Sequence, residues 1–335
     1  MTPRRWLIVL AFLPMHIMAQ TSHRDSVRQV VRERMLTIDS VMGERYNRIT
    51  FDTLYIRRPQ SRLTFKVRGN VSGTSISSEG SRNGNEIGSD VSTDHKATLS
   101  FGVNYRGLTA GFALNPASLS GRSKDYEMNI NAYSNRYGFD VVYQTSQTLS
   151  GNVTLGGVDR TLDKGIFTMK MVTINGYYAF NGRRFSYPAA FSQSYIQRRS
   201  AGSWLVGLSY LGGSIKADNE AIGNNSYRVY IGYFGLGGGY GYNLVLGQKW
   251  LIHLSALPTL VVSNYSNVKI NGERLDMATK FPNIILAERG AVVYNFSDKY
   301  FAGLTMVMTN SLLGSRTIDI NYRKWRARMF FGFRL

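Results

Sequence analysis

Cysteine is absent from the 335 residues of this chain. Without it the chain forms no disulfide, carries no lipidated N-terminal cysteine and offers no thiol for metal binding or catalysis. Histidine is nearly as scarce, with four copies, and the three beyond residue 19 stand far apart at positions 23, 95 and 253. We therefore expect no metal and no cofactor, and we expect the fold to be stabilised by its architecture alone.

Long apolar runs are also missing after the N-terminus. Arg4 and Arg5 precede an apolar run over residues 6–12, and Ala19 supplies a small residue before Gln20. This order is typical of a cleaved signal peptide, and the run is shorter than the ~20 apolar residues of a spanning helix. We predict that residues 1–19 are removed on export in a Gram-negative bacterium.

Acidic residues are few, 21 against 40 Lys and Arg, which gives a formal charge of +19. Such an excess often indicates nucleic-acid binding, but export makes that partner unsuitable. The expected partners are outer-membrane lipid and lipopolysaccharide, the barrel-assembly machinery and a small anionic solute. The sequence identifies no periplasmic partner.

Two periodicities divide the remaining chain. Residues 20–61 form a predicted periplasmic segment, in which apolar residues three to four apart over 22–46 favour an amphipathic helix. From residue 62 to 335 the period becomes two, which indicates strands with unlike faces. The predicted strands are 62–70, 96–106, 108–115, 125–133, 137–147, 165–178, 200–214, 226–242, 249–265, 281–296, 299–311 and 322–335.

The connections between these strands alternate in length. The short ones, near residues 106, 135, 245 and 297, fall on one side, as the periplasmic turns of an outer-membrane barrel do. Residues 179–199, AFNGRRFSYPAAFSQSYIQRR, break this rule, because they are long and lie on the side of the short turns. We interpret them as a plug inside the barrel or as a periplasmic insert.

The last strand carries the strongest membrane signal. Trp325, Met329 and Phe333 share one face with other apolar residues, whereas the opposite face carries cations that a dry core would not tolerate. Phe331, Phe333 and Leu335 are similar to the C-terminal assembly signal of outer-membrane proteins. The sequence thus predicts an antiparallel transmembrane β-barrel of about twelve strands in the outer membrane. A secreted soluble β-protein is the alternative.

Three segments carry a family resemblance: NGRRFSYPAAFSQSYIQRRSAGSWLVGLSY at 181–210, YRGLTAGFALNP at 105–116 and NRYGFDVVYQ at 135–144. With them the chain resembles, from about Phe51 onward, an uncharacterised family of exported proteins common in Bacteroidota. The resemblance implies an outer-membrane-type β-barrel. It implies no activity, substrate or catalytic residue.

Two sets of candidate site residues follow from the strands. His253 and Ser255 would lie side by side on one strand face, where His could activate Ser, and Asn267 follows at a spacing similar to that in outer-membrane phospholipases and lipid A deacylases. The second set would contact anions in the lumen and comprises Arg183, Arg184, Lys324, Arg326, Arg328 and Arg334.

A third set, in the segment 71–95, could bind calcium through carboxylate oxygens, although its spacing matches no EF-hand loop: Glu79, Glu86, Asp90 and Asp94. The favoured function is a plugged or narrow pore, or a binding or structural component of the envelope, with a basic lumen. A lipid-modifying hydrolase is the alternative with chemistry of its own.

Overall fold

The computed structural model describes residues 37, 40, 43, 44 and 48–335, apart from 62, 83, 106–107, 115–124, 156, 219–225, 271–272, 276–279 and 316–317. Residues from Thr50 to Leu335 form one compact unit. The predicted signal peptide and most of the predicted helix at 22–46 lie outside the described residues, so both remain predictions. No described helix is both long and apolar enough to cross a membrane.

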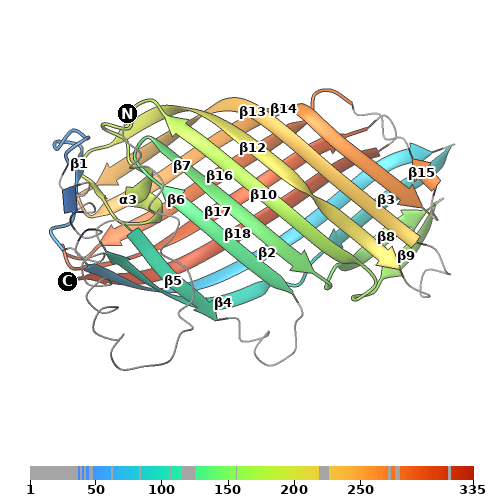
Figure 1. Cartoon of the computed structure of the whole chain (residues 1–335), viewed down its shortest axis with the longest axis horizontal. Helices are drawn as coiled ribbons and strands as arrows, with labels where there is room; N and C mark the ends of the chain where they lie inside the picture. The colour runs from blue at the N-terminus through green and yellow to red at the C-terminus, as the bar shows by residue number, and fades with distance from the viewer. Residues whose placement is uncertain are drawn as a thin grey trace, which may run out of the picture. The chain divides into compact units, whose positions relative to one another are not determined.

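This unit is almost entirely antiparallel β-structure with one short helix (Figure 1). Its elements are β1 (Ile56–Arg57), β2 (Leu63–Arg82), β3 (Asn85–Ser92), β4 (Lys96–Tyr105), β5 (Leu108–Leu114), β6 (Tyr126–Tyr133), β7 (Tyr137–Ser146), β8 (Ser150–Leu155), β9 (Val158–Leu162), β10 (Thr168–Ala179), α3 (Tyr187–Phe191), β11 (Ile196–Gln197), β12 (Ala201–Asp218), β13 (Ser226–Leu246), β14 (Trp250–Ile270), β15 (Glu273–Leu275), β16 (Ile284–Asn295), β17 (Tyr300–Gly314) and β18 (Ile318–Arg334).

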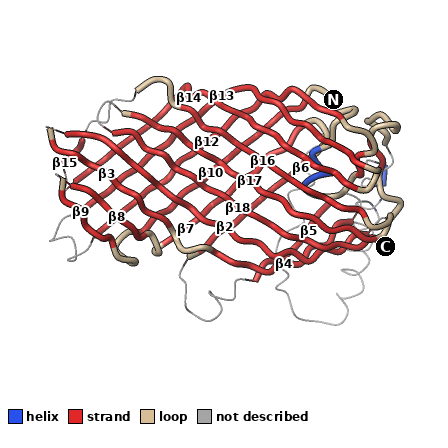
Figure 2. The backbone as a smooth tube through the Cα atoms, turned by 180° about the vertical axis from the view of Figure 1, so that it is seen from behind, coloured by secondary structure: helices blue, strands red, loops and turns tan. Residues whose placement is uncertain are grey.

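The main sheet curls back on itself. Its strands follow the order β6-β7-β10-β12-β13-β14-β16-β17-β18-β2-β3-β8-β9, with β4 and β5 continuing from β2. β8 pairs with β3 near the far end of this order, yet β8 begins at Ser150, just after β7 ends at Ser146. Because β7 lies near the first end, the sheet must close around an interior (Figure 2). Among the described strands, β5 and β6 each pair with one neighbour and border the remaining seam.

The predicted antiparallel β-fold is confirmed, but the strand number is wrong. The sheet has sixteen strands, and twelve of them coincide with the predicted ones. The other four, β3, β8, β9 and β15, lie in the longer connections between the predicted strands. These strands are polar, so they lack the apolar alternation on which the prediction relied, although their backbones pair.

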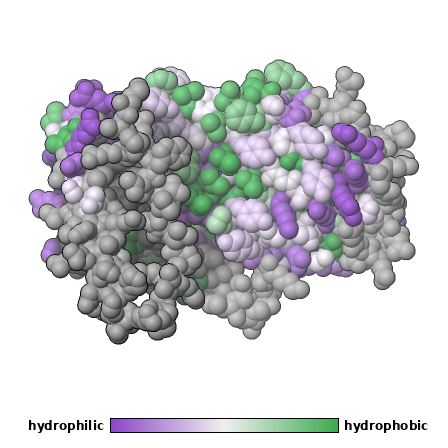
Figure 3. Space-filling model, viewed as in Figure 1, coloured by the Kyte–Doolittle hydropathy of each residue, from purple (hydrophilic) through white to green (hydrophobic). Residues whose placement is uncertain are grey.

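The two faces of the sheet differ as the alternation predicted. On β18, Met329 is 66% exposed on the outside, whereas Arg334 is 1% exposed on the inside. The visible outer face is apolar over its middle and hydrophilic toward the end where β9 and β15 lie (Figure 3). Inside, one apolar cluster includes α3, and a second, separate cluster contains Met169, Leu211, Ile285 and Tyr322.

We expect Gly151→Ala to weaken the β3–β8 closure. Gly151 has a φ of +148°, and an added Cβ would lie 2.1 Å from the carbonyl oxygen of Asp90 on β3. The substitution should lower the free energy of unfolding by about 1–3 kcal/mol, measured by urea titration in detergent micelles. Gly69→Ala, where the added Cβ meets nothing within 4 Å, is the control; equal stability of both variants would contradict the role of this pairing.

Candidate functional site

The long connection between β10 and β12 folds into a compact segment, which we call the plug and define as residues 185–197. Ser186 begins α3 by accepting a hydrogen bond at its Oγ from the Ala189 amide at 3.3 Å, and Pro188 stands in the first turn. Every residue of α3 is buried. The plug ends in β11, which pairs with β1, so residues before the first long strand hold it in place.

The plug lies inside the curled sheet, at the end where β1 is found (Figures 1 and 2). Asn243 of β13 donates to the Ser186 carbonyl at 3.0 Å. From the opposite wall, Lys66 of β2 donates to the Ser192 carbonyl and, at 3.1 Å, to Gln193. Since β13 and β2 are separated by four strands in the sheet order, the plug spans the interior.

An ion pair crosses the interior beside the plug. Arg289 of β16 donates to Asp140 of β7 at 2.6 Å, and the two side chains are 1% and 3% exposed. The Tyr133 hydroxyl donates to the same carboxylate. The guanidinium also lies 5.8 and 5.9 Å from the ring centroids of Tyr177 and of Tyr187 in the plug. Because β16 and β7 are not neighbours, this pair joins opposite walls.

A polar layer lies deeper in the interior, beyond the plug. Lys324 of β18 forms an ion pair with Glu127 of β6 at 2.6 Å. Asn175 of β10 donates to Thr309 of β17 at 3.1 Å. Neither contact joins neighbouring strands, so side chains cross the lumen at this level too.

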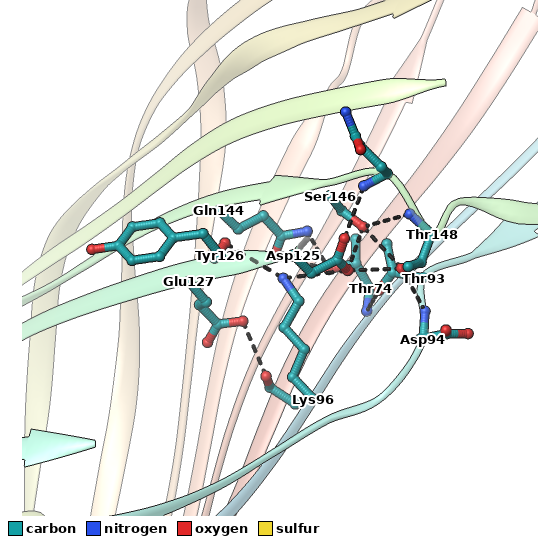
Figure 4. A network of polar contacts seen from close by, with 12 residues as sticks. Thr74, Thr93, Asp94, Lys96, Asp125, Tyr126, Glu127, Gln144, Ser146 and Thr148 are labelled. Atoms are coloured by element: carbon teal, nitrogen blue, oxygen red, sulfur yellow. Dashed lines mark hydrogen bonds and ion pairs between the residues drawn. The ribbon is translucent and has the colours of Figure 1, made fainter. Parts of the chain in front are cut away.

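The polar layer continues to the place where β4 approaches β6 and β7 (Figure 4). Asp125 accepts hydrogen bonds from Ser146 and Thr148, both at 2.7 Å, and its carboxylate lies 3.7 Å from the Lys96 amine. Thr74 of β2 meets Gln144 of β7 nearby. These side-chain contacts join β2 and β4, on one side of the seam, to β6 and β7 on the other, where the described strands share no backbone pairing.

His253 and Ser255 are brought together as predicted by their spacing, with Nε2 and Oγ 3.0 Å apart. The group that orients the imidazole is Asn243, whose Oδ1 lies 2.7 Å from Nδ1. Asn243 uses its amide nitrogen on Ser186 and Gln197, so its oxygen accepts from Nδ1 and Nε2 is left to accept from Ser255. Asn267, toward the other end of β14, instead donates to Tyr265.

The histidine is enclosed by the plug. The rings of Phe185, Tyr187 and Phe191 lie 5.9, 4.9 and 5.1 Å from the His253 ring, and His253 is fully buried. The plug therefore covers the imidazole, and Ser255 beside it is only 9% exposed. Sequence reasoning missed Asn243 because it falls in a predicted turn.

The predicted anion-contacting residues separate into two groups. Lys324, Arg326 and Arg334 are buried on the inner face and Arg328 is half-buried there. Arg183 and Arg184 are exposed, and Arg184 lies 3.4 Å from Asp52 and over the Tyr55 ring. The structure does not bring these two arginines to the inner cations.

The sequence analysis missed four inner cations: Lys66, Arg68, Lys96 and Arg289. The alternation of each strand could have identified them, because each occupies one of the alternate positions whose side chains face inward.

The acidic residues at 79, 86, 90 and 94 are exposed on β2, β3 and the corner after β3. Within the described residues, no three His, Asp or Glu side chains gather as a metal site would require.

We expect Asp140→Asn to destabilise the protein by about 3–5 kcal/mol, because it leaves the Arg289 charge buried without its counter-ion. Asp298→Asn is the matched control, since Asp298 pairs with Arg57 at a site where the carboxylate is 68% exposed; it should cost less than about 1 kcal/mol. Urea unfolding in micelles measures both. The double variant Asp140→Asn/Arg289→Met should regain stability, and a further loss would contradict this account.

Comparison with known proteins places this geometry in context. No curated protein matches the chain. Solved structures similar to it include the outer membrane protease OmpT from Escherichia coli, with 8% identity, a TM-score of 0.41 and coverage of 87% of this chain and 100% of that one. The outer membrane protein OprG from Pseudomonas aeruginosa has 13% identity, a TM-score of 0.28 and coverage of 82% and 97%.

A further similar structure is the toluene transporter TodX from P. putida, with 7% identity, a TM-score of 0.25 and coverage of 83% and 91%. These similarities are too distant to transfer a function. A family model described as a domain of unknown function (DUF4421) matches residues 50–335. The chain belongs to this DUF4421 family.

Proposed function

We propose that the protein is an outer-membrane β-barrel closed to free diffusion, which serves the envelope as a binding or structural component with a basic interior. The observation that carries this proposal is the set of contacts across the lumen. The plug, the Arg289–Asp140 pair and the Lys324–Glu127 pair each join strands that are not neighbours. An open pore would instead leave its inner side chains in water.

The outer face supports a membrane location. Trp204, Leu254 and Met329 are 66–69% exposed although they are apolar, a cost that contact with lipid removes. Exposed aromatic residues mark both ends of this face, with Trp250 and Tyr300 at one end and Tyr265 and Phe281 toward the other. Outer-membrane lipid, lipopolysaccharide and the barrel-assembly machinery are the partners that follow from this location, after export with a cleaved signal peptide.

A secreted soluble protein would differ in its behaviour. The membrane proposal requires the protein to sediment with the outer membrane, to need detergent for solubility and to change its gel mobility on heating. Solubility without detergent would contradict it.

We expect the wild-type protein to give no steady current in planar lipid bilayers. Deletion of residues 183–197 should produce an anion-selective current, because it removes the largest obstruction and leaves inner cations in excess over carboxylates. Deletion of residues 273–275, which removes β15 but leaves the plug and the β3–β8 pairing, is the control. A wild-type current of porin size, or a plug deletion as silent as the wild type, would contradict the proposal.

A lipid-modifying hydrolase is the second candidate, because Asn243, His253 and Ser255 form a hydrogen-bonded series suited to activating a serine. The enclosure of His253 by the plug argues against it. We expect Ser255→Ala to leave the phospholipid and lipid A profiles of the cell unchanged, measured by mass spectrometry against the wild type. Altered lipids would place the hydrolase first.

A further inference from the structure

The inner face of the barrel has an uneven balance of charge. Among the residues that the structure describes, eight cations face inward: Lys66, Arg68, Lys96, Arg289, Lys324, Arg326, Arg328 and Arg334. Three carboxylates of the same described set also face inward: Asp125, Glu127 and Asp140. Each carboxylate is already engaged by a cation, namely Lys96, Lys324 and Arg289 respectively. The carboxylates described on the inner face are thus occupied before the arginines at 68, 326 and 328 are considered.

Three of these lie together on the adjacent strands β2 and β18. Arg68 on β2 is paired in register with Phe330 on β18, and Arg328 lies two residues before that position. Arg326 is the next inward residue on β18. The three side chains carry like charges at neighbouring inward positions, so they repel one another. Within the described part of the chain, none of the three forms an ion pair with a carboxylate. We call Arg68, Arg326 and Arg328 the arginine cluster.

Neutral amides orient the cluster without cancelling its charge. Arg328 donates from Nε to the Asn70 oxygen at 2.7 Å. Arg326 donates to Asn129 and, at 3.3 Å, to Asn131. A guanidinium has five N–H donors. These bonds therefore orient the side chains and leave further N–H groups of each guanidinium for a ligand. Arginines that only stabilise a fold would be expected to pair with carboxylates, as Arg289 does.

A glycine on the neighbouring strand β4 leaves space for the Arg68 side chain. Gly102 on β4 has no side chain, and a Cβ there would lie 2.4 Å from Nη2 of Arg68. The guanidinium thus rests against the strand backbone, facing the interior beside the other two. Arg68 and Arg328 are only half-buried, so part of each side chain stays open to water inside the barrel.

From this arrangement we propose that the arginine cluster is a binding site for a compact oxyanion, the phosphate or carboxylate group of a small solute. Guanidiniums match such a group in charge and in hydrogen-bonding geometry, and here three of them lie on neighbouring inward positions of two adjacent strands. The inference deepens the proposed function, since it assigns the basic interior a ligand class. It also predicts that the cluster costs stability when no anion is bound.

The test compares thermal unfolding of detergent-solubilised full-length variants in inorganic phosphate and in potassium chloride of equal ionic strength. For the wild type we expect a saturable rise in Tm of at least about 2 °C in phosphate. Arg68→Gln and Arg328→Gln should lose this rise, and without phosphate they should unfold at the same temperature as the wild type or higher, because repulsion is relieved. Arg323→Gln is the matched control, since Arg323 lies on the exposed outer face of β18 and its variant should keep the full response.

Three results would overturn the proposed site. The first is a rise in wild-type Tm in chloride equal to that in phosphate, and the second is a rise in phosphate that the cluster variants keep. The third is a loss of this rise only in variants whose Tm without phosphate has also fallen by a large amount. A second arm replaces phosphate with phosphatidylglycerol in mixed micelles. A response to this lipid alone would move the anion from a solute to a membrane headgroup and contradict the proposal.

Bilayer currents test the closed barrel separately. If the protein gives no current and no phosphate response, the arginine site is refuted and the proposed function stands. If the protein conducts and also responds to phosphate, the arginine site stands and the proposed closure of the barrel is refuted.

Discussion

Pairing of β3 with β8 is the constraint from which the interior follows. β8 continues the chain almost directly from β7, so its pairing with β3 forces distant parts of one sheet to meet. Closure brings opposite walls close enough for single side chains to cross between them, as Asn175 does to reach Thr309. Every polar group on the inner face must then find a partner inside or keep contact with water.

The interior satisfies this requirement in layers. At one end the plug supplies backbone carbonyls and aromatic rings to inner residues such as Lys66 and Arg289. Carboxylates and amides from β6 and β7 then meet the cations of β16 and β18. Beyond them an apolar cluster around Leu211 and Ile285 fills another part of the inner face. The plug, the ion pairs and the apolar side chains thus occupy successive levels of the interior.

Arginine serves two different purposes within this interior. Arg289 is neutralised by Asp140, and the ion pair links β16 to β7 across the interior. Arg328 bonds to an amide and keeps its charge, beside other cations. The two side chains are chemically the same and both point inward, so the distinction comes from the partner: a carboxylate on the opposite wall for Arg289 and an amide on the adjacent strand for Arg328.

The sequence predicted the strand positions well because a strand with one apolar and one polar face has an unmistakable period. Alternation also identified the inward residues Lys324, Arg326 and Arg328. It failed for the polar strands β3, β8, β9 and β15, where no apolar face marks the period and only backbone pairing defines the strand. It likewise paired His253 with Ser255, which lie two residues apart on one strand.

By itself, then, the sequence determined which side faces inward in the strands that have one apolar and one polar face, since this depends on local periodicity. Tertiary structure alone decided which inward residues meet: Asn243 rather than Asn267 orients His253, and Asp140 rather than another acid neutralises Arg289. Those contacts depend on sheet register, curvature and the path of the plug. These properties arise from long-range pairing, for which a local pattern of residues carries no signal.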